Sequence, residues 1–222
     1  MNFKQFCSDI LILSDPEKGK QMSSYMRDQF EFLGVPAERR RESSKKQFDT
    51  AREENEIDWE FVEACWEQNF REFQYVAIDY LILMQHFLEK EDLDRIKDLV
   101  LTKSWWDTVD NLNKPIGTLV MTYPELEDEM IAWSKADNIW LRRSAIIFQL
   151  GFKKYTNKEL LSEIIQNNFD SREFFINKAI GWALREFSKT DPDWVAEFLR
   201  EYKHRLATIS YREATKILNK TN

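Results

Sequence analysis

The feature that most constrains the fold of this 222-residue chain is a helix-like segment that recurs at a nearly constant interval. Four segments look alike, and they are residues 71–78, 104–110, 139–146 and 174–180. Aligning Ala77, Asp110, Ala145 and Ala179 gives steps of 33, 35 and 34 residues. Such a period is typical of solenoids, in which each helix pair buries its apolar face against the neighbouring pairs.

Amphipathic stretches of mixed charge lie between these segments and predict a second helix in each repeat, at residues 92–101, 125–135 and 158–168. The small residues that tetratricopeptide repeats carry at fixed positions are missing, so the repeats are closer to the HEAT kind. We predict an all-α superhelix, a solenoid of HEAT-like repeats, as a single domain over residues 1–222. The first helices hold the Trp, Arg and Asp residues, and we expect them to line its concave face.

Composition excludes several other classes. Five Gly and five Pro are too few for a barrel or sandwich, which needs turns every ~8–12 residues. The longest apolar run, Tyr80 to Met84, is much shorter than the roughly 20 residues that span a bilayer. No basic segment followed by an apolar one stands at the N-terminus, and two cysteines suit a reducing compartment. We expect a cytoplasmic protein without membrane contact.

Capping residues predict the first helices. Asp15 and Pro16 are typical of a helix start, and we expect this helix to continue to Gly34, a natural C-terminal stop. Pro36 then opens a basic helix, and Asp58 caps another one after an acidic loop.

Charge is distributed unevenly along the chain. The net charge is −7, but residues 140–222 carry 15 Lys and Arg against 10 Asp and Glu. Such asymmetry indicates a polyanion partner. The alternative is random unevenness over a solvated surface.

Most catalytic signatures are missing. The chain has no P-loop, no GxGxxG, no GxSxG and no HExxH motif. With His86 and His204 as the only histidines, a His-based metal site or a Ser-His-Asp triad is disfavoured. Cys7 and Cys65 have no histidine nearby in sequence, so we interpret them as structural residues and expect neither a metal nor a cofactor.

Trp106 and Asp110 form an unusual pair for a protein core. They are four residues apart and therefore share one face of a helix. Burying an unpaired aspartate costs several kcal/mol, so a purely structural role is unexpected. The alternative is a helix N-cap at Ser104 or Asp107 with a half-buried tryptophan.

Two later stretches are also unusual. Arg142 and Arg143 open the equivalent helix of the next repeat, where a solvated face is the alternative. Gly181 interrupts a predicted helix beside Trp182, at a cost of ~1 kcal/mol. A glycine there suggests the close approach of a ligand or of a neighbouring helix.

Together, residues 104–110, 138–143 and 174–182 resemble the signature stretches of the AlkD family of bacterial DNA glycosylases, as do residues 25–26 and 32–34. The resemblance runs in order over nearly the whole chain. It implies a HEAT-like solenoid that holds double-stranded DNA along its concave face. It also implies excision of cationic N3- and N7-alkylpurines, such as 3-methyladenine and 7-methylguanine, by hydrolysis of the N-glycosidic bond in base excision repair.

By matching positions, the resemblance implies that Trp106 and Trp182 pack against the deoxyribose of the lesion. It implies that Asp110 faces the anomeric carbon and that Arg143 holds a nearby phosphate. The further residues expected on DNA are Tyr25, Arg142, Lys178 and Arg185. We expect a monofunctional enzyme that acts as a monomer. The alternative is a non-catalytic HEAT-like scaffold for structured DNA or a protein, which would not need the trio of Trp106, Asp110 and Trp182.

Overall fold

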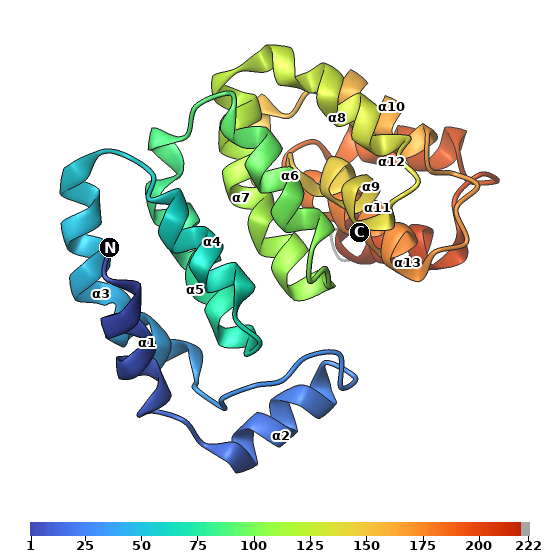
Figure 1. Ribbon diagram of the computed structural model, residues 1–222. Helices are drawn as coiled ribbons and strands as arrows, with labels where there is room; N and C mark the ends of the chain where they lie inside the picture. The colour runs from blue at the N-terminus through green and yellow to red at the C-terminus, as the bar shows by residue number, and fades with distance from the viewer. Residues whose placement is uncertain (219–222) are drawn as a thin grey trace. The chain divides into compact units, whose positions relative to one another are not determined.

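The computed structural model describes residues 1–218, and all regular elements in that part of the chain are helices (Figure 1). The all-α prediction is confirmed. Contacts between residues group into two compact units, Met1–Glu89 and the chain from Lys90 onward. The single domain over residues 1–222 stays a prediction, and each unit is described by itself. Among residues 1–218, no helix is both long and apolar enough to cross a membrane.

The first unit is built around a cluster of aromatic rings. Its helices are α1 (Phe3–Leu11), α2 (Pro16–Tyr25), α3 (Ala37–Glu54), α4 (Trp59–Glu67), α5 (Arg71–Met84) and the short 3-10 helix η1 (Gln85–Phe87). Phe6, Phe48, Phe61, Phe73 and Tyr80 pack with ring centroids 5.5 to 6.4 Å apart. This cluster holds α1, α3, α4 and α5 together.

The two cysteines of the first unit are free thiols, with Cys65 buried and Cys7 half-buried. Burial raises the pKa of both, and it raises that of Cys65 well above its usual range. Both thiols are therefore protonated near neutral pH, which fits a structural role.

Helix α2 ends at Tyr25, so its predicted continuation to Gly34 was wrong. The start was right, because the Asp15 carboxylate accepts from the Lys18 backbone N–H at 3.2 Å. Arg27 and Asp28 adopt left-handed backbone angles, with φ of 58° and 54°, and a helix cannot continue through them.

Gly34 instead belongs to the segment that returns from α2. Its φ is +84°, and a Cβ there would lie 2.0 Å from the Asp15 carbonyl oxygen, so only glycine fits. The backbone N–H groups of Leu33, Gly34 and Val35 donate to the buried Glu72 carboxylate at 3.0, 2.8 and 3.1 Å. These bonds fix the returning segment on α5.

The second unit contains three of the four predicted repeat segments, residues 104–110, 139–146 and 174–180, while residues 71–78 lie in α5 of the first unit. Its elements are α6 (Asp92–Leu101), α7 (Trp106–Thr122), η2 (Pro124–Leu126), α8 (Glu127–Ser134), α9 (Ile139–Ile147), η3 (Lys153–Tyr155), α10 (Lys158–Gln166), α11 (Phe174–Phe187), α12 (Pro192–Glu201) and α13 (Thr208–Leu218). The first helices α7, α9 and α11 pack in succession, and α13 packs on α11 (Figure 1). Behind them, α8 packs on α9 and on α10. This stacking of helix pairs confirms the solenoid-like fold.

Gly181 explains how closely α13 approaches α11. A Cβ at this position would lie 2.5 Å from the Glu213 Cβ and 2.8 Å from the Ser210 carbonyl oxygen. The Ser210 hydroxyl also donates to the Asn177 carbonyl at 2.7 Å. The close approach predicted at Gly181 is therefore made by a neighbouring helix.

Candidate functional site

The starts of four helices in the second unit set a common register. The fifth residues of α7, α9, α11 and α13 are Asp110, Arg143, Lys178 and Arg212. We call these four the fifth-residue row. The alignment of the repeats in the sequence instead paired Asp110 with Ala145 and Ala179. Ala145 lies two residues after Arg143, and Ala179 lies one residue after Lys178. That alignment was wrong because small residues recur at several positions of each helix, whereas the helix starts fix the faces.

Asp110 and Arg143 of this row form a two-pronged ion pair between α7 and α9. Arg143 donates from Nε to Asp110 Oδ1 at 2.7 Å and from Nη2 to Asp110 Oδ2 at 2.8 Å. Its Nη1 donates to the Phe175 carbonyl at 2.5 Å. Arg143 therefore links three successive first helices, and its planar fork holds the Asp110 carboxylate in one orientation.

This ion pair lies mostly out of water, since the side chains of Arg143 and Asp110 are 6% and 16% exposed. Burial raises the pKa of the Asp110 carboxyl above the usual range of an aspartate, while the hydrogen bonds and charge of Arg143 oppose that rise. A carboxylate offers about four lone-pair positions, and Arg143 uses two of them. Asp110 thus keeps acceptor capacity on its solvent side.

The two tryptophans of the predicted trio are both half-buried. Trp106 is the first residue of α7 and stands one turn before Asp110 on the same face. Trp182 lies on α11, one turn after Lys178. The structure thus places each tryptophan one turn from a member of the fifth-residue row, and their joint contact with a nucleotide stays a prediction.

The N-cap alternative for Ser104 and Asp107 was wrong. The N-cap position of α7 is Trp105, whose side chain makes no capping bond. The Ser104 hydroxyl donates instead to the Val100 carbonyl at 2.7 Å, and Asp107 lies buried inside the first turn of α7.

An aromatic cluster at the starts of the first helices was not predicted from the sequence. The rings of Trp105, Trp140 and Phe175 pack with centroids 5.1 to 5.7 Å apart. Their spacing of 35 residues was a signal that could have found them. The cluster fixes the helix ends from which Asp110 and Arg143 project.

A second missed feature is Glu213 on α13, which gathers basic side chains from two helices. Its carboxylate accepts from Lys178 Nζ at 2.9 Å and from Lys216 Nζ at 2.8 Å, and it also forms an ion pair with Arg185. The Glu213 side chain is only 6% exposed. Lys178 and Arg185 of α11, both predicted DNA contacts, are therefore anchored on α13, whose sequence the four aligned segments left out.

The remaining predicted DNA contacts occupy different environments. Tyr25 is 73% exposed at the end of α2 in the first unit. Arg142 is half-buried beside Arg143 on α9. Both remain predictions as DNA contacts.

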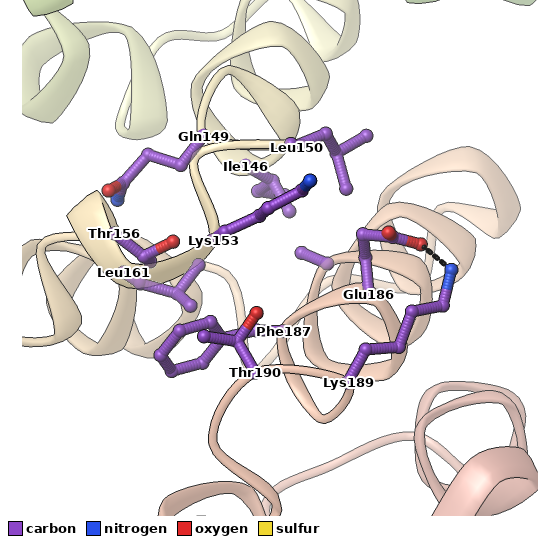
Figure 2. A pocket seen from close by; sticks show the side chains of 12 residues that line it. Ile146, Gln149, Leu150, Lys153, Thr156, Leu161, Glu186, Phe187, Lys189 and Thr190 are labelled. Carbon is purple, nitrogen blue, oxygen red and sulfur yellow. Dashed lines mark hydrogen bonds and ion pairs between the residues drawn. The ribbon is translucent and has the colours of Figure 1, made fainter.

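A cavity of about 150 Å³ lies among α9, α10 and α11 (Figure 2). Ile146, Leu161 and Phe187 contribute apolar side chains, and Lys189 pairs with Glu186 at its edge at 2.6 Å. None of the residues assigned to the site lines this cavity. Within residues 1–218, no group of His, Cys, Asp and Glu side chains is arranged to hold a metal ion.

Comparisons with known proteins agree on one family. The family model of the DNA alkylation repair enzyme matches residues 9–218. A structure called "Predicted DNA alkylation repair enzyme" from Enterococcus faecalis is 37% identical, with a TM-score of 0.85, and the match covers 93% of this chain and 97% of that one. No match was found among curated proteins.

Two structures from Streptococcus mutans share the fold at lower identity. AlkD2 is 21% identical, with a TM-score of 0.61 over 79% of this chain and 88% of its own. The smu.31 protein of strain UA159 is 20% identical, with a TM-score of 0.61 over 79% of this chain and 91% of its own.

Proposed function

Because the chain belongs to the DNA alkylation repair enzyme family, we propose that it is a monofunctional DNA glycosylase for cationic N3- and N7-alkylpurines in duplex DNA. The observation that carries the proposal is the ion pair of Asp110 with Arg143, which holds a carboxylate in a fixed orientation one turn from Trp106. A protein scaffold has no evident need for an oriented, mostly buried carboxylate.

The chemistry suits a site without histidine. An alkylated purine carries a fixed positive charge, so it leaves as a neutral base with the electron pair of the glycosidic bond and needs no general acid. As the bond breaks, positive charge develops on the deoxyribose. The Asp110 carboxylate stabilises that charge mainly in the transition state, which raises the rate.

Water completes the hydrolysis at the anomeric carbon. Asp110 orients this water through the lone pairs that Arg143 leaves open, and the released proton passes to the carboxylate or to solvent. The product is a free base and an abasic site in an uncut strand. The tryptophan faces of Trp106 and Trp182 favour a nearby cation by ~0.5–2 kcal/mol each.

Arg143 acts first as a positioning residue in this scheme. Three of its five N–H groups donate to Asp110 and to the Phe175 carbonyl within the described part of the chain. Its hydrogen bonds and charge oppose the rise in the pKa of Asp110 that burial causes, and so favour the ionised carboxylate. The phosphate contact expected for Arg143 stays a prediction. One of its other N–H groups would have to make this contact.

The other DNA contacts in this proposal are Tyr25, Arg142, Lys178 and Arg185. We further propose that the protein works as a monomer in a bacterial cytoplasm without metal or cofactor. The bacterial origin of the similar structures supports the choice of host.

The direct test is release of free base from DNA treated with a methylating agent. We expect the purified protein to release 3-methyladenine and 7-methylguanine, detected by mass spectrometry, and to leave abasic sites without strand breaks before alkali treatment. Unmethylated DNA and methylated DNA without protein are the controls. Release no faster than in the protein-free control would contradict the proposal and favour the scaffold alternative.

A further inference from the structure

Helix α13 extends the fifth-residue row by one more basic position. Its fifth residue, Arg212, is exposed, and Lys216 follows one turn later on the same face. The row passes from Asp110 and Arg143 through Lys178 to Arg212, on helices that pack in succession. A ligand that runs along the row from Asp110 therefore reaches α13.

The cluster around Glu213 holds more positive than negative charge. Lys178, Arg185 and Lys216 all pair with this one carboxylate. Desolvation lowers the pKa of Lys178, and the positive charges of Lys216, Arg185, Arg212 and Arg143 lower it further. The cations thus repel one another in spite of Glu213.

Such an excess of positive charge matches a polyanion. The chain as a whole is acidic, with a net charge of −7, so this concentration of cations is a local feature of α11 and α13. Like charges gathered on one surface lose their mutual repulsion when phosphates neutralise them. A DNA backbone supplies phosphates at regular intervals.

We propose that α13 is part of the DNA-binding surface, with Arg212 and Lys216 binding backbone phosphates beyond the lesion and Glu213 positioning Lys178, Arg185 and Lys216. This inference rests on the proposed function for the identity of the ligand. It adds two contacts and one positioning residue that sequence analysis did not assign.

The test compares two double variants that remove the same charge. One is Arg212→Ala with Lys216→Ala. The control is Lys135→Ala with Arg200→Ala, two exposed residues of the same unit that each pair with one glutamate. Binding of each protein to an undamaged fluorescent duplex is measured over a range of salt concentrations.

We expect the affinity of the α13 variant for DNA to fall by about 10-fold or more. The slope of log affinity against log salt should become shallower by up to about 1.8, because each lost phosphate contact removes about 0.9. The control is expected to keep the wild-type slope. Arg212→Ala alone, which leaves the Glu213 pairs intact, should remove about half of the slope change.

The inference would be overturned if the α13 variants kept the wild-type salt slope. It would also be overturned if the control variant lost as much of that slope as the α13 double variant. These outcomes are separate from the test of the proposed function. If the wild-type protein binds DNA but releases no base, the glycosylase proposal fails while the binding comparison still decides the role of α13.

Discussion

Asp110→Asn is expected to lower the single-turnover rate of alkylpurine excision by about 100-fold or more, the scale for losing one preorganised electrostatic stabiliser. Asparagine keeps the shape of the side chain but cannot oppose a developing sugar cation with a full negative charge. Binding to undamaged duplex should stay close to wild type, because a negatively charged carboxylate does not attract phosphate. The measurement is release of 7-methylguanine from a defined duplex with protein in excess.

A matched control for this variant is Asp94→Asn, an exposed change on α6 in the same unit. It should leave excision unchanged. Asp110→Asn also weakens the hold on Arg143, so the thermal midpoint of each protein must be measured to show that it is folded at the assay temperature. Excision by folded Asp110→Asn at the wild-type rate would show that another group stabilises the transition state.

Arg143→Met is expected to destabilise the fold by about 3 kcal/mol, the low end for breaking a buried pair, because Asp110 keeps some contact with solvent. It should also slow excision by up to about 100-fold through misplacement of Asp110. The same variant should move the acid limb of the pH–rate profile to higher pH. The measurements are thermal unfolding and single-turnover rates over a pH series, with protein-free depurination subtracted at each pH.

The sign of this pH shift follows from the cause of the pKa shift. Burial already raises the pKa of Asp110, so the wild-type rate should begin to fall at a higher pH than an exposed aspartate would give. Arg143 opposes that rise, and its removal should raise the pKa further. In Arg143→Lys the acid limb should lie closer to its wild-type position than in Arg143→Met, because lysine returns a positive charge. An acid limb at the wild-type position in Arg143→Met would contradict the role of Arg143 as the group that keeps Asp110 ionised.

The helical architecture could be predicted because its causes are local. The spacing of apolar residues and the caps at Asp15 and Asp58 determine where helices form, and both caps accept backbone N–H groups as expected. The end of α2 could not be predicted, because it depends on left-handed angles at Arg27 and Asp28, which neither residue type requires. The return to Glu72 on α5 requires a contact almost 40 residues away.

The spacing of the candidate site residues along the chain indicated which of them share a helix face, but not which of them pair across helices. Trp106 and Asp110 share a face of α7 by their spacing alone. The ion pair of Asp110 with Arg143 was missed, because the sequence alignment placed Ala145 opposite Asp110. Aligning the helices by their first residues places Arg143 opposite Asp110 and gives Arg212 the equivalent position on α13.

The role of Glu213 could not be predicted from the sequence, for a different reason. A single glutamate on an amphipathic helix is usually solvated, and nothing in its neighbourhood marks it as buried. Its burial follows from Gly181, which lets α13 pack directly on α11. The glycine is visible in the sequence, but the helix that packs against it is not.

The central claim is that catalysis uses the charge of the lesion in place of a general acid. The most direct test is single-turnover excision of 7-methylguanine and of hypoxanthine from otherwise identical duplexes. We expect 7-methylguanine to leave faster by about 100-fold or more, since a neutral base needs a proton and general acid catalysis contributes that much. The difference should lie in the rate at saturating protein more than in binding. Comparable rates for the two bases would require a general acid and would contradict this mechanism.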